Sequence, residues 1–264
     1  MKKKESREET PPIQSLDRGL LIVETVARST EPVSLAELTN LLEIDRSSVF
    51  RLANTLRRRG FLSYSPDRKV YTLGPAVWRL YHEYDWGAML IRVSRDYVKW
   101  LSAETEETVH LAIRKGKQAL FIDHAVTKHA IAVSGQTGEL VPLHCTAHGQ
   151  ALLANCEKDD LKTILGSDTL EAYTKQTIVS IDQLAKTCAQ IREQGYATDD
   201  GEYQDGLRCV AAPIRAVGGL IIGSIGISVP LRRFPKERYR VCGEQVSTAA
   251  SRISERLSNE ASVS

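Results

Sequence analysis

The stretch SLAELTNLLEIDRSSVFRLANTLRRRGFLSYSPDRKVYTL, residues 34–73, decides the fold of the amino-terminal part of this chain. Ser34 and Glu37 have the spacing of a capping box, in which each side chain accepts a hydrogen bond from the backbone N–H of the other residue. Apolar residues follow at helical spacing and predict a first helix: Leu35, Leu38, Leu41 and Leu42. A short turn at Glu43 and Ile44 leads to Asp45, a favourable N-cap for a second helix.

The second helix of this stretch is predicted to have two different faces. The positions expected to face the core are Val49, Leu52 and Leu56. The opposite face, which is polar and cationic, holds Ser47, Arg51, Asn54 and Arg58. Such a face suits a helix that lies in the major groove of double-stranded DNA and contacts both phosphates and base edges.

A hairpin is predicted directly after this helix, which ends at Gly60. Residues 61–64 and 69–73 pair around the turn 65–68, and this wing brings Arg68 and Lys69 to a phosphate backbone. Residues 43–69 hold seven Lys/Arg against three Asp/Glu, a local surplus that is typical of a DNA-binding surface. The sequence therefore predicts a winged helix-turn-helix.

The residues predicted to contact DNA are Arg46, Ser47, Ser48, Arg51, Asn54, Arg58, Arg68 and Lys69. We expect Ser47, Ser48 and Arg51 at or near base edges, and the remaining arginines and Lys69 at phosphates. The alternative is a solvated helical bundle whose arginines only keep it soluble. That alternative requires a capped helix, a tight turn, a cationic helix and a basic hairpin to coincide by chance.

The whole-chain composition is that of a folded protein, with 264 residues, 42% hydrophobic and 26% charged. The formal net charge is only +2, but it is unevenly distributed. Residues 1–80 hold 14 of the 35 Lys/Arg and 10 of the 33 Asp/Glu, so the remaining residues hold 21 and 23. Only the amino-terminal part is therefore suited to a polyanion.

Cysteine usage and hydropathy indicate the compartment. The five cysteines are an odd number without any CxxC pair, which argues against a disulfide framework and for reducing surroundings. The amino-terminal MKKKESREETPP is not followed by an apolar segment, and no apolar run approaches the ~20 residues of a membrane span. We expect a cytoplasmic protein without a membrane partner.

Four segments are expected along the chain: a disordered tail (1–12), the winged helix-turn-helix (13–75), a connector helix (76–100) and an effector-binding domain (101–260). A helix over 14–27 is predicted to complete the first domain, with Leu16, Leu20, Val23 and Ala27 on its inner face. The connector begins at Pro75, includes Trp78 as an apolar position, and is predicted to be interrupted at Gly87.

The second domain mixes strands and helices without strict alternation, which favours an α+β fold. Strands are predicted over 108–113, 118–125, 130–134, 207–214 and 220–229. Helices are predicted over 146–155, 158–165, 182–193 and 236–257. The inner face of the last helix is predicted to hold Tyr239, Cys242, Val246, Ala249, Ile253 and Leu257.

Three further stretches carry a family resemblance: GELVPLHCTAHGQALLA (138–154), GYATDDGE with GLRCVAAP (195–202 and 206–213), and IGISVP (225–230). In this order, and together with the helix-turn-helix, they resemble the IclR family of bacterial transcriptional regulators over residues 14–257. Residues 107–111 and 231–234 resemble, more narrowly, a branch that senses a sugar-acid breakdown product.

The resemblance implies a GAF-like effector domain, a six-stranded antiparallel sheet flanked by helices, in a homodimer or homotetramer. It also implies a small organic acid or aromatic acid bound beside the sheet. Residue by residue, the family's pocket carries over onto Ala147, His148, Asp199, Leu207, Cys209 and Ser228. The chain departs from the family at Gln150, where a lysine is common, and at Arg215-Ala216, where an aromatic residue and Asp or Asn are usual.

The residues themselves point to the same pocket. The start of the helix near Thr146 offers backbone N–H groups to an anion, and Asp199 can accept a hydrogen bond from a ligand hydroxyl. Val133 and Leu207 supply apolar walls, and the predicted effector-binding residues are Val133, Ala147, His148, Asp199, Leu207, Cys209 and Ser228. The alternatives are core packing for the cysteine, leucine, serine and histidine, and a simple turn for Asp199.

The expected function is a ligand-responsive DNA-binding regulator, a repressor of a catabolic operon that senses a small organic acid. The alternatives are an activator of aromatic-acid catabolism, an enzyme with an appended DNA-binding domain, and an architectural DNA binder. The chain has no nucleophile elbow, P-loop, HExxH or dinucleotide fingerprint, so we expect no enzyme and no cofactor. His144 and His148, with Cys145 between them and Cys209 nearby, leave a metal site as a minor alternative.

Overall fold

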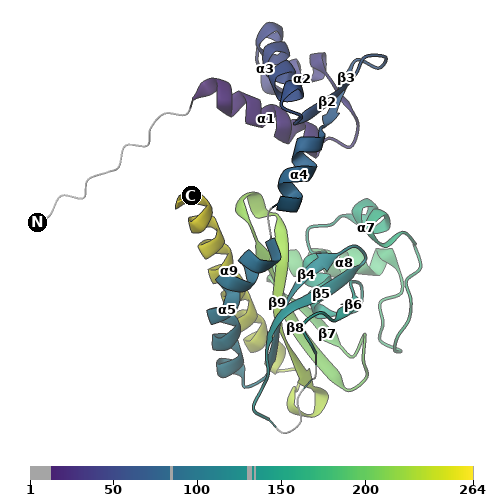
Figure 1. Cartoon of the computed structure of the whole chain (residues 1–264). Helices are drawn as coiled ribbons and strands as arrows, with labels where there is room; N and C mark the ends of the chain where they lie inside the picture. The colour runs from purple at the N-terminus through teal and green to yellow at the C-terminus, as the bar shows by residue number, and fades with distance from the viewer. Residues whose placement is uncertain (1–12, 84–85, 130–132, 134, 264) are drawn as a thin grey trace, which may run out of the picture. The chain divides into compact units, whose positions relative to one another are not determined.

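The computed structural model describes residues 13–83, 86–129, 133 and 135–263 (Figure 1). The chain divides into two compact units, residues 1–85 and residues 86–264. The predicted tail over 1–12 and most of the predicted strand over 130–134 lie outside the described residues, and Val133 itself lies in no strand. No helix within the described residues is long and apolar enough to span a bilayer.

The first unit is a winged helix-turn-helix. Its helices are α1 (Gln14–Arg28), α2 (Leu35–Leu42), α3 (Arg46–Arg58) and α4 (Pro75–Glu83). Its strands are β1 (Val33–Ser34), β2 (Leu62–Ser65) and β3 (Val70–Leu73), which form an antiparallel sheet in the order β1-β3-β2. The predicted hairpin is confirmed, and β1, which the sequence pattern did not reveal, pairs with the outer edge of β3.

The predicted starts of α2 and α3 in the first unit are both confirmed by their hydrogen bonds. The Ser34 N–H donates to Glu37 Oε2 at 2.7 Å, and the Glu37 N–H donates to Ser34 Oγ at 3.2 Å. Asp45 Oδ1 accepts from the Ser48 N–H at 2.9 Å. The caps fix where α2 and α3 begin, and therefore which side chains α3 turns outward.

The predicted inner face of α1 is wrong. Leu16 and Leu20 are 60% and 55% exposed, Ala27 is exposed, and Val23 is half-buried. The buried positions are Gly19, Ile22 and Val26. The helix carries two apolar stripes, and periodicity alone cannot choose between them because both have helical spacing. Packing against α3 and β3 selects the stripe with the small and β-branched residues.

Two smaller expectations also fail, and a third is displaced. Leu41 of α2 is 66% exposed although it was predicted to be part of the apolar stripe. Trp78 of α4, predicted as an apolar position of the connector, is also 66% exposed. The interruption predicted at Gly87 is displaced: α4 ends at Glu83 and α5 (Trp86–Thr105) begins before Gly87, which lies in its first turn.

The second unit is built on one six-stranded antiparallel sheet, in the order β6-β5-β4-β9-β8-β7. Its strands are β4 (Thr108–Lys115), β5 (Gln118–Ala125), β6 (Leu140–Pro142), β7 (Ala197–Asp200), β8 (Leu207–Arg215) and β9 (Ile221–Pro230). Its helices after α5 are α6 (Ala147–Leu152), α7 (Lys158–Leu165), α8 (Ile181–Gln194) and α9 (Arg238–Val263), with 3-10 turns at Val217–Gly219 and Leu231–Arg233. The α+β class is confirmed, whereas the short edge strands β6 and β7 were missed.

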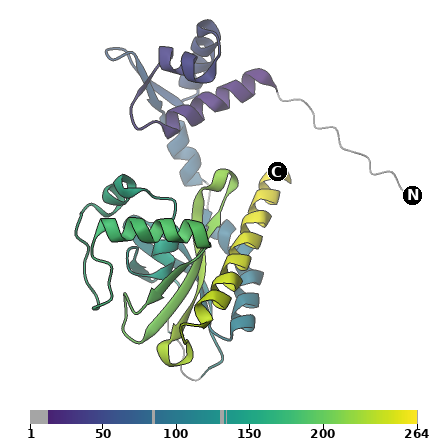
Figure 2. The same cartoon turned by 180° about the vertical axis from the view of Figure 1, so that it is seen from behind.

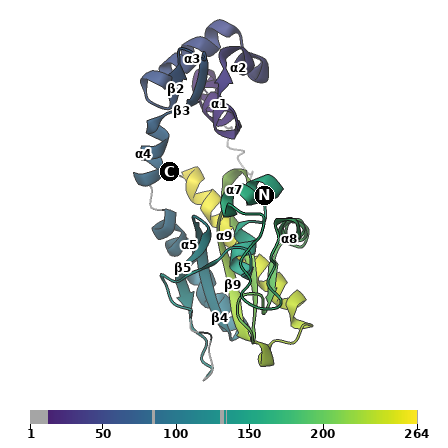
Figure 3. The ribbon, with the colours of Figure 1, turned by 90° about the vertical axis from the view of Figure 1, so that its right-hand side faces the viewer.

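Helices cover both faces of this sheet. Figures 1 and 2 show α5 and α9 side by side against one face, and Figure 3 shows strands β4 and β9 between α5 and α8. The predicted inner face of α9 is confirmed, with Tyr239 half-buried and the other five positions buried. Alternate strand residues such as Val109 and Leu111 join this core, so the residues between them point to the opposite face.

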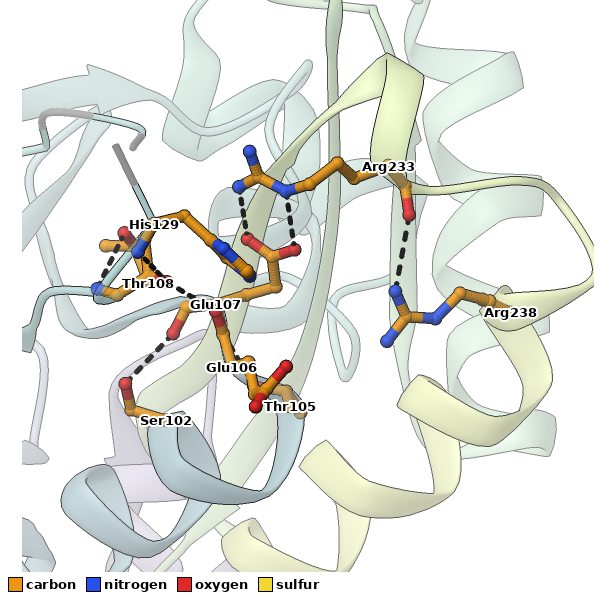
Figure 4. A network of polar contacts seen from close by, with 9 residues as sticks. Ser102, Thr105, Glu106, Glu107, Thr108, His129, Arg233 and Arg238 are labelled. Atoms are coloured by element: carbon orange, nitrogen blue, oxygen red, sulfur yellow. Dashed lines mark hydrogen bonds and ion pairs between the residues drawn. The ribbon is translucent and has the colours of Figure 1, made fainter. Parts of the chain in front are cut away.

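A buried ion pair joins the start of β4 to the turn after β9 (Figure 4). Arg233 Nε and Nη2 donate to the two carboxylate oxygens of Glu107 at 3.1 and 2.7 Å. The Glu107 side chain is 3% exposed and the Arg233 side chain 28%. Arg238 Nη1 also donates to the Arg233 carbonyl at 3.2 Å. The two segments that carry the narrower family resemblance therefore meet in this contact.

We expect Arg233→Met to lower the free energy of unfolding by about 3–5 kcal/mol, because it leaves a buried carboxylate unpaired. The matched control is Arg232→Met, which changes the exposed neighbour in the same turn. Urea unfolding followed by circular dichroism measures both. Removing the acid as well, in Glu107→Gln with Arg233→Met, should recover part of the loss. Equal unfolding free energies for the two single variants would contradict this role of the ion pair.

Candidate functional site

A cavity of about 110 Å³ opens on the face of the sheet that α6 covers. All seven residues predicted to bind an effector line it: Val133, Ala147, His148, Asp199, Leu207, Cys209 and Ser228. The other lining residues, which the sequence did not indicate as a set, are His110, Phe121, Gly135, Glu139, Val141, Thr146, Tyr203 and Gln204. Contact of any of them with a ligand remains a prediction.

Three of the predicted residues stand in one row across the sheet. Asp199 on β7 pairs with Cys209 on β8, and Cys209 pairs with Ser228 on β9. Because directly paired residues point to the same face, all three side chains face the cavity. The Cys209 thiol donates to Ser228 Oγ at 3.4 Å. The register of three strands therefore assembles a carboxyl, a thiol and a hydroxyl at adjacent positions.

Helix α6 covers this row from above. Its N-cap is Thr146, whose Oγ1 accepts from the Gly149 N–H at 3.1 Å and donates to the Pro142 carbonyl at 2.7 Å. A Cβ at Gly149 would lie 2.3 Å from the Leu143 carbonyl oxygen, so only glycine lets α6 approach the preceding chain this closely. Ala147 and His148 are thereby held against the sheet and are 0% and 2% exposed.

His110 and Phe121 are the most important lining residues that sequence reasoning missed. Their rings are stacked with centroids 4.4 Å apart, and His148 meets His110 edge-on at 6.1 Å and Phe121 edge-on at 5.2 Å. The one available signal was a histidine at an inward position of an otherwise apolar strand, 108–113. Nothing in the pattern indicated that this inward face lines a cavity.

Both histidines are neutral at physiological pH. Burial lowers the pKa of His110 to about 4, against a smaller opposing effect of the nearby Gly135 backbone. Burial lowers the pKa of His148 to about 3, and proximity to His110 lowers it further. His148 Nδ1 shares a 3.0 Å hydrogen bond with Ser224 Oγ. Both ring nitrogens of His110 and Nε2 of His148 are buried without a hydrogen-bond partner among the described residues.

The acids beside the cavity bind protons unusually tightly. Burial raises the pKa of Asp199 to about 7, although Asp199 Oδ1 accepts the Glu202 N–H at 2.7 Å. Burial, and then the charge of Asp199, raise the pKa of Glu202 to about 8. The neighbouring Asp200 behaves in the opposite way. Burial opposes its charge, but its bonds to Lys236 and Arg208 together lower its pKa.

The thiols beside the cavity are not activated. Burial is the main cause that raises the pKa of Cys209 and of Cys145, so both stay protonated and are poor nucleophiles. His144 Nε2 lies 2.9 Å from the Glu171 carbonyl oxygen, whereas His148 faces the cavity. Across the part of the chain that the structure describes, no three His, Cys, Asp or Glu side chains are grouped as metal ligands.

The two departures from the family have different consequences. Gln150 is buried, and its Nε2 donates to the His144 carbonyl at 3.1 Å and to Glu202 Oε2 at 2.8 Å. An uncharged amide therefore contacts Glu202 at the position where the family resemblance implies a lysine. Arg215 does not line this cavity, and its Nη1 donates to Asn155 Oδ1 at 2.9 Å and to the Gly219 carbonyl.

Six of the eight predicted DNA-contacting residues lie on α3, and Arg68 and Lys69 lie in the turn between β2 and β3. Arg46, Ser47, Arg51, Arg58, Arg68 and Lys69 are exposed, while Ser48 and Asn54 are half-buried. Ser48 and Arg51 also line a surface groove with Gln14, Ser15, Arg18, Leu52 and Thr55. The core face includes Ala53, which the pattern omitted.

Phe50 is a further candidate for contact with DNA in the major groove, and it was not identified from the sequence. It is 53% exposed and lies one helical turn before Asn54, on the polar side of α3. Phenylalanine contacts the methyl group of thymine in some DNA complexes. Asn54 Oδ1 accepts from Arg57 Nη2 at 3.0 Å.

Comparison with known families assigns both units. A model described as the IclR helix-turn-helix domain matches residues 15–66. A second model, described as the bacterial transcriptional regulator IclR C-terminal, matches residues 85–255. Together these matches cover well over half of the chain. The first match lies in the winged helix-turn-helix, and the second includes every strand of the sheet that carries the cavity.

Individual relatives agree with this assignment. The chain is 30% identical over 246 residues to the transcriptional repressor IclR of Escherichia coli, covering 92% of this chain and 90% of that protein. It is also 30% identical over 225 residues to the HTH-type transcriptional regulator KdgR of Escherichia coli, covering 85% and 86%. The Agobacterium tumefaciens repressor BlcR superposes with a TM-score of 0.59 at 26% identity, covering 93% of this chain and 97% of that chain. Equal identity to IclR and KdgR leaves the narrower resemblance a prediction.

We expect Asp199 and Glu202 to lower the free energy of unfolding as the pH rises, with a net fall between about 6.5 and 8, because the buried neutral histidines favour the fold increasingly up to their ordinary pKa and offset the carboxyls at lower pH. Asp199 and Glu202, with pKa values of about 7 and about 8, hold protons more tightly in the folded chain than in the unfolded chain. Their stabilising contribution is complete below the ordinary carboxyl pKa and is lost as the pH rises through these values. Asp199→Asn and Glu202→Gln should each gain stability over the parent progressively across this range.

Urea unfolding at pH 4, 6 and 8 measures the effect. The matched control is Asp200→Asn, which should lose stability at pH 8, because a lowered carboxyl pKa stabilises the fold above the ordinary value. The same pH dependence in Asp199→Asn, Glu202→Gln and the parent would contradict the prediction.

Proposed function

We propose a function for this chain from one established premise: it belongs to the IclR family of bacterial transcriptional regulators, and is a ligand-responsive DNA-binding regulator rather than an enzyme. The finer proposal is that it represses a catabolic operon and that a small organic acid relieves the repression. We also propose the division into a tail (1–12), a DNA-binding domain (13–75), a connector (76–100) and an effector domain (101–260).

The observation that carries the proposal is the convergence of seven predicted residues on one cavity. Asp199, Cys209 and Ser228 come from three adjacent strands, and Ala147 and His148 come from the helix above them. Packing of a hydrophobic core does not by itself require a carboxyl, a hydroxyl and two imidazoles to face the same cavity. Buried polar groups need partners, and a polar ligand supplies them.

An aliphatic hydroxy or oxo acid suits this cavity better than an aromatic acid. A cavity of about 110 Å³ is several times larger than the roughly 10–15 Å³ that a single water needs, so a small molecule fits. Its inner side presents Asp199, Ser228 and the two histidines, whose hydrogen bonds a ring of carbon atoms would leave unmade. The stacked pair of His110 and Phe121 is the one feature that favours the aromatic alternative, because an aromatic ligand can extend the stack.

At the DNA end, α3 is proposed to lie in the major groove with the wing beside the backbone. In a homodimer or homotetramer, two such helices would read half-sites ~34 Å apart or a multiple of that distance. An effector shifts DNA affinity only by binding one conformation better than another, typically with ~1–3 kcal/mol of coupling.

Arg51→Ala is expected to weaken binding to the specific operator by ~1–3 kcal/mol and binding to random DNA by much less, because Arg51 is proposed at a base edge. Electrophoretic retention of the promoter fragment upstream of the chain's own gene, at two salt concentrations, measures both affinities. Arg28→Ala, at the end of α1, is the charge-matched control. Equal losses on specific and random DNA would place Arg51 at a phosphate instead.

Ser228→Leu is expected to abolish the response to the effector while DNA binding persists, since the larger side chain fills the cavity and removes a hydroxyl. A thermal-shift screen of small organic acids finds the effector first. A ligand at 100 times its dissociation constant adds about 2.7 kcal/mol of stability. Release of DNA by the effector is then compared in the parent and the variant, and a normal dose-response in Ser228→Leu would remove Ser228 from the binding site.

A further inference from the structure

We propose that this cavity binds a small monocarboxylate together with one proton, and that Asp199 holds the proton while the ligand is bound. The inference rests on the proposed effector pocket and deepens it, because it names the charge class of the effector and the group that makes an anion acceptable there. No bond of the ligand is made or broken. One proton passes from the solvent to the Asp199 carboxylate.

The cavity offers an anion no fixed positive charge. Among the described lining residues there is no lysine and no arginine, while Asp199 and Glu139 are both acids. Residues 130–132 and 134, on either side of Val133 in the chain, are Ala, Ile, Ala and Ser and bring no charge. A carboxylate placed beside an ionised Asp199 in such a buried site would be strongly repelled.

The contrast with the next residue shows how unusual Asp199 is. Asp200 points to the opposite face of β7, where Lys236 Nζ lies 2.8 Å and Arg208 Nε 2.5 Å from its carboxylate oxygens. Asp199 is 3% exposed, and its Oδ1 accepts the Glu202 N–H at 2.7 Å. Burial outweighs this bond and the Gly201 and Tyr203 backbone groups, which also favour the ionised form, and so raises its pKa. Within the described part of the chain, no cationic side chain forms an ion pair with Asp199.

The titratable groups around Asp199 are acidic or neutral on every side. The loop after β7 contributes Glu202 and Tyr203, β8 contributes Cys209, and the Tyr239 hydroxyl of α9 donates to the Asp199 carbonyl at 3.3 Å. On the other side lie Cys145 and His148 at the start of α6, His110 of β4, and Glu139 at the exposed edge of the cavity. None of these groups carries a positive charge at neutral pH, so protonation is the available way to remove the negative one.

The proton goes to Asp199 rather than to a histidine. Burial raises the pKa of Asp199 to about 7, so its carboxyl binds a proton readily near neutral pH. His110 and His148, with pKa values of about 4 and about 3, are far harder to charge. The neutral imidazole of His148 has a different use. The buried Nε2 of His148 has no partner among the described residues, so it can donate to a carboxylate oxygen in the tautomer in which the Ser224 hydroxyl donates to Nδ1.

The direction of the pH dependence follows from this assignment. An anion bound next to Asp199 raises the pKa of that carboxyl further, so the ligand binds the protonated pocket more tightly. Affinity is then nearly constant below about pH 6. Above about pH 8 it falls about tenfold for each pH unit, until the pH reaches the pKa of Asp199 in the complex.

Isothermal titration calorimetry on the full chain tests this with lactate and pyruvate as probes. Lactamide, which has the shape of lactate without its charge, is the matched neutral ligand. Titrations at pH 6, 7.5 and 8.5, each in two buffers of different ionisation enthalpy, give affinity and proton uptake together. We expect proton uptake near zero at pH 6 and approaching one per ligand at pH 8.5, with affinity about eightfold lower at pH 8.5 than at pH 7.5. Lactamide should take up no proton.

Variants locate the proton. Asp199→Asn, which is permanently neutral, should keep carboxylate binding and remove its pH dependence. Glu202→Gln should keep the pH dependence, and a flat profile in this variant would assign the proton to Glu202 and overturn the inference. Asp200→Asn, on the opposite face of the same strand, is the control and should keep the proton uptake, with its pH range shifted downward because the Asp200 charge no longer raises the pKa of Asp199. The proton uptake of the parent chain decides the question even if Asp199→Asn does not fold.

The inference is overturned if both carboxylates bind without proton uptake, if Asp199→Asn folds but no longer binds them, or if neither binds at any of the three pH values. Retention of the promoter fragment is measured on the same preparations. Intact DNA binding with no carboxylate binding rejects this inference and leaves the regulator standing. Loss of DNA binding with intact proton-linked carboxylate binding rejects the proposed function alone.

Discussion

The alternation of side chains on a single six-stranded sheet is the constraint on which the second unit depends. One set of strand residues, with Val109 and Leu111 among them, packs under α5 and α9 and forms a continuous apolar core. The intervening residues must point the other way, and there they include His110, Cys209 and Ser228. A shift of one residue in any strand would exchange the two sets and place polar groups in the core. The same pairing that stabilises the sheet therefore also assembles the candidate site.

Burial gives that site its chemistry. Two imidazoles are kept neutral, a thiol is kept protonated and two carboxyls hold protons near neutral pH, all chiefly because water is excluded. Ion pairs, where they occur in this unit, lie elsewhere. Glu107 is satisfied by Arg233, and Asp200 by Lys236 and Arg208. In the cavity, polar groups are thus buried without an ion-pair partner among the residues described. Such groups with shifted pKa values are typical of ligand-binding sites.

The first unit depends on exposed, charged side chains instead of buried, neutral ones. Its candidate DNA-contacting side chains are mostly exposed, and α3 presents them because a capped start and an apolar stripe fix the rotation of that helix. These charges are exposed to solvent, where salt weakens their attraction to phosphates. The affinity for DNA is therefore expected to fall as the ionic strength rises. Specific recognition and ligand binding are therefore separable by experiment, since one depends on exposed cations and the other on buried neutral groups.

The sequence by itself determined the family, the α+β class, both helix caps of the first unit and most strand and helix ranges, because these depend on local signals of spacing, capping and alternation. It also identified Asp199, Cys209 and Ser228, through the resemblance, without indicating that they share one row. Tertiary structure decided what local signals leave open: which of two apolar stripes of α1 is buried, where the short strands β6 and β7 pair, and that His110 and Phe121 complete the cavity. Each of these depends on contacts between residues distant in the chain. The same holds for the burial of Asp199 without a cationic partner in the described part of the chain, although its neighbour Asp200 forms ion pairs.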